Sequence, residues 1–128
     1  MQRVDEVEVI VDGVRLDTGS PHLICEHANL GSLNVDHEGA AIRYSDEYKD
    51  EGINVNFVTI GDNKDLVEVR TYERGVEAET LSCGTGVTAV ALGLHYTNKI
   101  ESKDVAIKTQ GGLLRVTFET SENGYDNI

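Results

Sequence analysis

The feature that most constrains the fold is the apolar run from Val87 to Tyr96. Its residues leave almost no polar face when they are placed on a helix, and a helix that is apolar on nearly all sides must be covered on nearly all sides. In a chain of 128 residues, which is one domain's length, such a helix defines the centre of the fold. We therefore expect the other elements to surround it.

Most of the remaining chain shows the patterns of β-strands. The expected strands alternate apolar and polar residues or are rich in β-branched ones, and they lie at Val4–Asp12, Val14–Thr18, His22–Glu26, Asn54–Ile60, Leu66–Tyr72, Asp104–Thr109 and Leu113–Thr120. Asp12-Gly13 predicts a hairpin. A short helix is expected over Asp36–Ser45, and Tyr125–Ile128 is expected to be a polar tail. The pattern predicts an α+β fold with strands curling around one central helix.

Composition limits the function classes. A net charge of −12 argues against nucleic acid or an anionic membrane surface as a partner. No apolar run approaches the length that crosses a bilayer, and no basic-then-apolar leader opens the chain. The two cysteines form no disulfide framework, and the four histidines show no metal-ligand spacing. We expect a cytoplasmic protein without a metal ion.

A cysteine lies directly before the apolar run, in Ser82-Cys83-Gly84-Thr85-Gly86. The first turn of a helix has unpaired N–H groups and a partial positive charge, which bind an anion and lower the pKa of a nearby thiol. Gly84 and Gly86 lack a Cβ, so a ligand can approach the backbone. This segment suits acid–base chemistry at a carbon next to a carboxylate. The alternatives are a buried, inert Cys83 and an ordinary helix cap by Ser82 or Thr85.

At these residues the chain resembles the C-terminal half of the diaminopimelate epimerase family. The resemblance is carried by pieces in the family's order and near its spacing, which are Gly19-Ser20-Pro21-His22, Asn54-Val55-Asn56-Phe57-Val58, Tyr72-Glu73-Arg74-Gly75, Glu79-Thr80 and the Cys83 motif. It implies a half-barrel of mostly antiparallel or mixed strands around one central buried helix. Residues 1–128 are then a single domain, the C-terminal lobe of a two-lobed enzyme whose N-terminal lobe is absent.

The resemblance also implies an activity. The family inverts one stereocentre, interconverting LL- and meso-diaminopimelate for lysine and cell-wall precursors, without a cofactor. Two cysteines act on opposite faces of the carbon, one as thiolate and one as thiol. Cys83 matches one of them and the other belongs to the missing lobe, so the isolated lobe is expected to be inactive. Cys25 lies in an extended apolar stretch and is expected to be structural.

Substrate-binding residues follow from the same resemblance. Gly84 and Thr85 would hold the α-carboxylate at the reacting centre. Arg74 would bind a substrate carboxylate in a bidentate contact and Glu73 would bind the ammonium group, although a solvated strand end is the plain alternative. Asn54 would recognise the far end of the substrate.

Two places depart from the family's pattern. Ser20 stands where the family has an asparagine that contacts substrate, in the loop that also carries His22, so that contact is in doubt unless a water replaces it. The segment from Glu73 to Cys83 is one residue longer than usual, with Glu77-Ala78 in place of one glycine. We expect this insertion to fall in a loop that tolerates it.

Other functions use the same residues. A proline or hydroxyproline racemase-like lobe is one alternative, but Glu73-Arg74-Gly75 with Asn54-Val55-Asn56-Phe57 fits the epimerase better. A non-catalytic module that binds small carboxylates is another, and it needs no reactive thiol. A cysteine hydrolase that pairs Cys83 with His22 or His95 is weakened because His95 lies about three helical turns away. The surface left by an absent lobe would be apolar and would favour homodimers.

Overall fold

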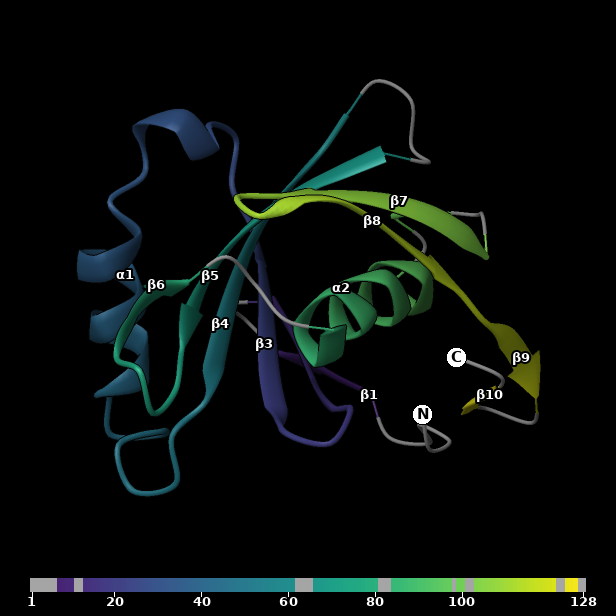
Figure 1. The fold of residues 1–128 in the computed structure, drawn as a ribbon. Helices are drawn as coiled ribbons and strands as arrows, with labels where there is room; N and C mark the ends of the chain where they lie inside the picture. Colours follow the sequence, from purple (N-terminus) through teal and green to yellow (C-terminus); the bar gives the residue numbers. More distant parts are fainter. Residues whose placement is uncertain are drawn as a thin grey trace.

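One mixed sheet forms most of the molecule (Figure 1). The computed structural model describes residues 7–10, 13–61, 66–80, 84–97, 99–100, 103–121 and 124–126, with the backbone alone at 84, 85, 121 and 126. The strands of this sheet are β1 (Val7–Ile10), β2 (Gly13–Asp17), β3 (Pro21–Glu26), β4 (Asn54–Ile60), β5 (Leu66–Glu73), β6 (Ala78–Thr80), β7 (Asp104–Thr109) and β8 (Gly112–Thr117). Their order is β1-β2-β3-β4-β5-β7-β8, and β6 pairs with β5.

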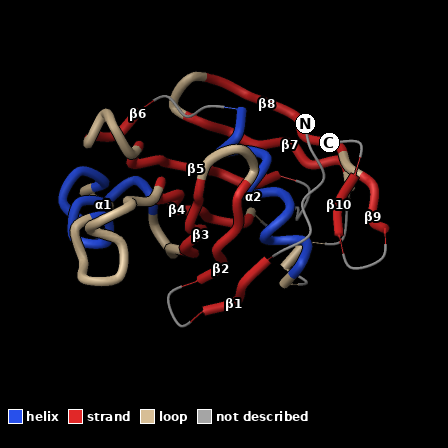
Figure 2. The backbone as a smooth tube through the Cα atoms, turned by 90° about the horizontal axis from the view of Figure 1, so that it is seen from below, coloured by secondary structure: helices blue, strands red, loops and turns tan. Residues whose placement is uncertain are grey.

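The sheet curves around helix α2 (Gly84–Tyr96), which contacts β2 and β3 on one side and β8 on the other (Figures 1 and 2). Residues Val87 to Leu92 and Leu94 are buried in this helix. All of them except Thr88 form one core cluster with Ile24, Val58 and other strand residues. The expected half-barrel around one central helix is confirmed, and the helix begins three residues before the predicted run because its Gly-Thr-Gly start is also helical.

The pairing is antiparallel except at two places, β3 with β4 and β5 with β7. A parallel pair needs a long crossover connection. The first crossover carries the short 3₁₀ turn η1 (Leu30–Ser32) and helix α1 (Val35–Arg43). The second carries β6 and α2, so both α-helices of the described residues lie in crossovers.

Helix α1 covers the other face of the sheet, opposite α2 (Figure 2). Its start is set by Asn34, whose side chain accepts a hydrogen bond from His37 N at 3.1 Å. Arg43 in the last turn suits the negative end of the helix. The predicted helix Asp36–Ser45 is confirmed with shifted ends. Within the described residues, neither helix has the length and apolar character that a membrane-crossing helix requires.

Two expectations about the strands were wrong. The second half of Leu113–Thr120 is not part of one strand, because β9 (Glu119–Ser121) leaves the sheet and pairs with β10 (Gly124–Asp126). Tyr125 therefore lies in a strand and not in a polar tail. Its buried ring stacks edge-on against Phe118 and His95, and covers the C-terminal end of α2. A lone tyrosine among polar residues gave no sequence signal for this contact.

Gly39 sets how closely α1 approaches the sheet. A Cβ at Gly39 would lie 2.4 Å from both Cβ and Cγ of Tyr72, a buried residue of β5. We expect Gly39→Ala to lower the free energy of unfolding by about 1–3 kcal/mol, because the overlap with the stem of Tyr72 outweighs the better helix propensity of alanine. Urea denaturation measures it. Gly31→Ala is the control, since its nearest neighbour is 3.4 Å away; equal stability of the two variants would contradict the prediction.

Candidate functional site

Polar residues gather on the α2-facing side of the sheet, beneath the start of that helix. The register places His22 beside Asn54 and Asn56 beside Thr71, so three neighbouring strands contribute. Ser20, just before β3, completes the group. We refer to Ser20, His22, Asn54, Asn56 and Thr71 as the polar cluster.

The same face turns apolar one step further along each strand. Ile24, Val58 and Val69 lie two residues from the polar cluster on β3, β4 and β5, and belong to the core cluster that contains α2. Side chains alternate between the two faces of a strand, so every second residue marks one face. The polar cluster is therefore the polar end of an otherwise aliphatic face, placed under the first turn of α2.

Asn56 holds the centre of the polar cluster. Its Nδ2 donates to the carbonyl of Leu23 at 3.3 Å, and its Oδ1 accepts from Thr71 Oγ1 at 3.0 Å. The carbonyl of Leu23 can only accept, so the side-chain atom that bonds to it is the amide nitrogen. The same nitrogen lies 3.0 Å from His22 Nδ1, to which it donates its second hydrogen. His22 Nδ1 is thus an acceptor, and the ring proton is on Nε2.

His22 is fully buried and neutral. Burial lowers its pKa from 6.5 to about 4, the charge of Asp17 acts in the opposite direction, and that of Arg74 lowers the pKa further. The Nε2–H donates to Ser20 Oγ at 3.2 Å. The histidine therefore works as a positioned hydrogen-bonding group and not as a positive charge near pH 7.

Asn54 joins the polar cluster to Arg74. Its amide nitrogen donates to Pro21 O at 3.0 Å and to Ser20 Oγ at 3.4 Å, and its Oδ1 accepts from the backbone N–H of Arg74 at 2.8 Å. Both amide hydrogens are used within the protein. In this structure Asn54 fixes the loop before β3 and the turn after β5; direct contact with a substrate stays a prediction.

Arg74 is a cation with spare donors. Its Nη1 donates to Glu51 O at 3.0 Å, and within the described part of the chain no carboxylate pairs with it. The other described arginines each form an ion pair with a carboxylate, and they are Arg15, Arg43, Arg70 and Arg115. In a chain of net charge −12, an arginine left without a carboxylate is available to an anionic ligand.

Glu73 ends β5 and Arg74 begins the following turn. Side chains two residues apart on a strand point to the same face, so Glu73 shares the α2-facing side of the sheet with Thr71 and the rest of the polar cluster. The expected acid and base therefore lie at the same end of the sheet as Ser20, His22 and Asn54.

The helix start lies against this cluster. A Cβ on Gly86 would be 3.2 Å from Asn56 Oδ1 and 3.3 Å from His22 Cε1, so glycine lets the first turn of α2 come close. The helix begins at Gly84, the residue after Cys83 in the sequence. Cys83 lies outside the described residues, and only the backbone of Gly84 and Thr85 is described. Their predicted roles stay predictions.

The structure thus brings together Ser20, His22, Asn54 and Arg74. It also adds Asn56 and Thr71, which the sequence reasoning missed. Asn56 is two residues from Asn54 and on the same strand face, which was the available signal. Cys25 is buried on the opposite face of the sheet, in the core cluster beneath α1, which supports a structural role.

The cysteine hydrolase alternative loses support. His95 Nδ1 lies 3.1 Å from the hydroxyl of Tyr125, at the end of α2 remote from Gly84. Both ring nitrogens of His22 face Ser20 and Asn56. No group of histidine, cysteine or acidic side chains that could hold a metal occurs among the described residues.

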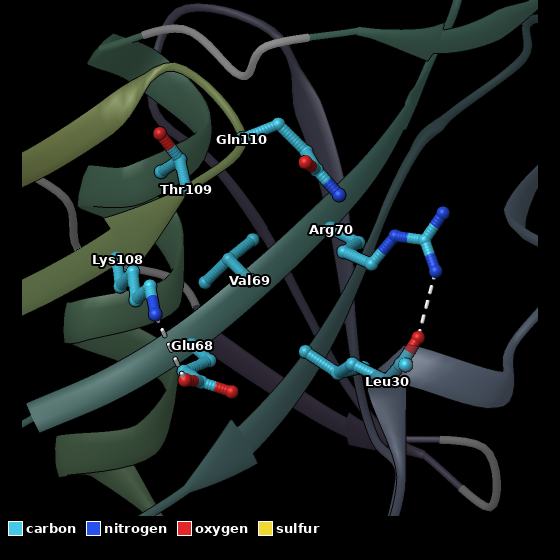
Figure 3. A pocket seen from close by; sticks show the side chains of 8 residues that line it. Leu30, Glu68, Val69, Arg70, Lys108, Thr109 and Gln110 are labelled. Carbon is cyan, nitrogen blue, oxygen red and sulfur yellow. Dashed lines mark hydrogen bonds and ion pairs between the residues drawn. The ribbon is translucent and has the colours of Figure 1, made fainter.

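A separate pocket of about 360 Å³ lies between η1, β5 and the β7–β8 turn (Figure 3). Arg70 in this pocket is fully engaged, with Nε and Nη2 on Glu79 at 2.7 and 2.6 Å and Nη1 on two backbone carbonyls. Lys108 faces Glu68 at 3.8 Å. Because both cations already have carboxylates, this pocket is a weaker site for an anion than Arg74.

Solved structures share this architecture at low sequence identity. A phenazine biosynthesis protein of the PhzF family from Bacillus anthracis has a TM-score of 0.61 and 19% identity, covering 97% of this chain and 38% of its own. A probable proline racemase from Agrobacterium radiobacter has a TM-score of 0.58 and 14% identity, covering 94% and 38%. The chain therefore shares the fold of somewhat more than a third of each of these larger proteins.

Sequence comparison identifies the family. The family model for diaminopimelate epimerase matches residues 14–126. The diaminopimelate epimerase of Flavobacterium psychrophilum is 46% identical over 128 residues, which is 100% of this chain and 50% of that protein. That of Aquifex aeolicus is 42% identical over 120 residues, 94% of this chain and 42% of that protein. The chain belongs to the diaminopimelate epimerase family, and spans about half the length of these curated relatives.

The buried, neutral state of His22 predicts a pH dependence of stability. Between pH 6.5 and about 4 the unfolded chain binds a proton at His22 that the folded chain does not, so stability falls as the pH falls through this window. By pH 4 the loss reaches about 3 kcal/mol. Imidazole ¹⁵N shifts of the folded and urea-unfolded chain measure the two pKa values. A folded His22 with a pKa near 6.5 would contradict the predicted loss of stability between pH 6.5 and about 4, whereas the ¹⁵N shifts at neutral pH test the tautomer separately.

Proposed function

We propose that this chain is the C-terminal catalytic lobe of a cofactor-independent epimerase that interconverts LL- and meso-diaminopimelate in lysine biosynthesis. The observation that carries the proposal is Arg74, a guanidinium without a described carboxylate partner, held beside the polar cluster under the start of α2. The family assignment supplies the reaction.

The substrate carries a carboxylate and an ammonium group at each end. Its binding site therefore needs donors for carboxylates and acceptors for ammonium groups at two separate places. In the proposal the N–H groups at the start of α2 hold the α-carboxylate at the reacting carbon. Arg74 and Asn54 serve the remote end, and Glu73 accepts from an ammonium group. A neutral His22 adds no charge, so the attraction for carboxylates comes from Arg74 and from the helix terminus.

Inversion requires a base on one face of the α-carbon and an acid on the other. In the proposal Cys83, as thiolate, removes the α-proton; the bonding electrons enter the α-carbon and its carboxylate, where the helix N–H groups stabilise the developing charge. A thiol from the other lobe then delivers a proton to the opposite face. The reverse reaction exchanges the two roles, and no cofactor enters. A thiol base suits the reducing cytoplasm.

One lobe supplies only one of the two bases. We therefore propose that the partner of this chain is an N-terminal lobe with its own cysteine, which closes the other side of the substrate. Self-association into a homodimer is the alternative for the surface that this lobe would cover.

The test joins this chain to the N-terminal half of the Flavobacterium psychrophilum relative, and measures deuterium incorporation at the α-carbon of LL-diaminopimelate in heavy water. We expect incorporation by the fusion and none by this chain alone. Cys83→Ala in the fusion should slow it at least about 100-fold, since it removes an acid–base group. Cys25→Ala is the matched control and should keep the activity.

Two outcomes would count against the proposal. Incorporation by the isolated chain at the rate of the fusion would show that a second base is not needed. A Cys83→Ala fusion as active as the unmutated one would favour the carboxylate-binding module, in which the thiol has no chemical role.

A further inference from the structure

The turn between β5 and β6 has an unusual residue at its end. Glu77 has a φ of +58°, and among the described residues it is the one non-glycine in the left-handed region. Such a backbone costs about 1 kcal/mol or more for a residue with a Cβ. Glu77 is also part of the extra length in this segment, and the expectation that the insertion merely extends a loop was incomplete, because Ala78 already belongs to β6.

The carboxylate of Glu77 is the centre of a local network. Its Oε2 accepts from Arg43 Nε and from the backbone N–H of Gly75, both at 3.1 Å, and its Oε1 accepts from the Tyr72 hydroxyl at 3.1 Å. Its own N–H donates to Glu73 O at 2.8 Å. Burial acts to raise the pKa of Glu77, but the hydrogen bonds from Gly75 and Tyr72 and the charge of Arg43 outweigh it and lower the pKa, so the group is ionised near pH 7.

This network reaches Arg74 by two routes. The first is the turn itself, because Glu77 bonds the residues on either side of Arg74, Glu73 and Gly75. With the bond from Arg74 N to Asn54, the backbone of the turn is fixed at three successive residues.

The second route runs through Arg43 and the segment that follows α1. Arg43 Nη1 donates to Lys49 O at 3.2 Å and to Tyr48 O at 3.5 Å. Two residues beyond Lys49, the carbonyl of Glu51 accepts from Arg74 Nη1. The turn and this segment lie together at the lower left of Figure 1.

Gly52 shows how tightly the two arginines pack. It has a φ of +79°, and a Cβ there would be 2.6 Å from Arg74 Cδ and 3.0 Å from Arg43 Cζ. The side chains of Arg43 and Arg74 therefore lie against the same glycine. A carboxylate that fixes Arg43 also limits where the stem of Arg74 can go.

We infer that Glu77 is a positioning residue for Arg74, which it holds in the orientation that receives a carboxylate of the substrate. Glu77 does so by closing the turn and by fixing Arg43 against the segment that carries Glu51 O. The inference rests on the proposed function for the substrate, and on the hydrogen bonds and the packing around Gly52 for the positioning.

Glu77→Gly separates positioning from folding. Glycine adopts a φ of +58° without strain, so the loss of the carboxylate's bonds is partly offset and the fold is retained. In the fusion described above we expect the KM for LL-diaminopimelate to rise about 10–100-fold, which corresponds to about 1.4–2.7 kcal/mol and is the size of a charge-assisted contact. The kcat should change less than about threefold, because Cys83 is untouched.

Two controls accompany this variant. In Glu77→Gln the amide oxygen accepts from Arg43 and Gly75 while its nitrogen donates to the Tyr72 oxygen, so KM should stay within about threefold of the unmutated value. Val76→Gly adds a glycine to the same turn at an exposed side chain and leaves Glu77 intact. It should leave KM unchanged, since flexibility alone is not the proposed cause.

A second readout needs no catalysis. In this chain by itself, NMR of the Arg74 Nε–H and hydrogen exchange of the Gly75 amide report the orientation of the turn. Glu77→Gly should shift the first signal and remove the protection of the second, and Glu77→Gln should preserve both. If the unmutated fusion is inactive, the proposed function fails and this measurement decides the positioning by itself.

The outcomes separate clearly. An unchanged Arg74 signal in Glu77→Gly overturns the inference, whatever happens to KM, because the effect then does not pass through Arg74. A shifted signal with an unchanged KM in an active fusion also overturns it, because the orientation of Arg74 then has no bearing on the substrate.

Discussion

The burial of α2 is the constraint on which the other features depend. Its middle residues are buried on every side and almost all apolar, so the sheet has to curve until β2 and β8 both reach the helix. The two ends of the helix then meet different surroundings. The C-terminal end packs against the rings of Phe118 and Tyr125, whereas the N-terminal end faces the polar cluster. In the proposed function, this polar N-terminal end of the helix is where the substrate carboxylate binds.

A buried polar cluster is stable only if its hydrogen bonds are satisfied. Among the described side chains, no buried nitrogen or oxygen lacks a partner. Asn56 donates to a carbonyl and to a neutral histidine, and accepts from a hydroxyl, so no charge has to be buried in the cluster. A protonated His22 would present a donor to the Asn56 amide nitrogen and break this arrangement, which agrees with its low pKa.

Sequence patterns predicted the elements better than the contacts between them. Period-two alternation located the main strands, and the apolar run located α2, because both patterns are local. The strand Gly124–Asp126 is short and polar apart from Tyr125, so its pairing with β9 depends on contacts that no local pattern encodes. Within the site, Ser20, His22, Asn54 and Arg74 were predicted through the family resemblance. The bonds from Asn56 to His22 and from Arg43 to Glu77 depend on strand register and on a turn geometry that the sequence does not reveal.

The distribution of carboxylates explains how one arginine stays available in an acidic chain. Glu77 and Glu79 are two residues apart, and Arg74 lies close to Glu77 in the same turn. Glu79 is held by both nitrogens of the Arg70 fork, and Glu77 by Arg43, Gly75 and Tyr72. Both of these carboxylates are thereby committed to other donors. The ion pairs around the turn therefore do more than stabilise it, since they keep Glu77 and Glu79 from occupying the guanidinium of Arg74.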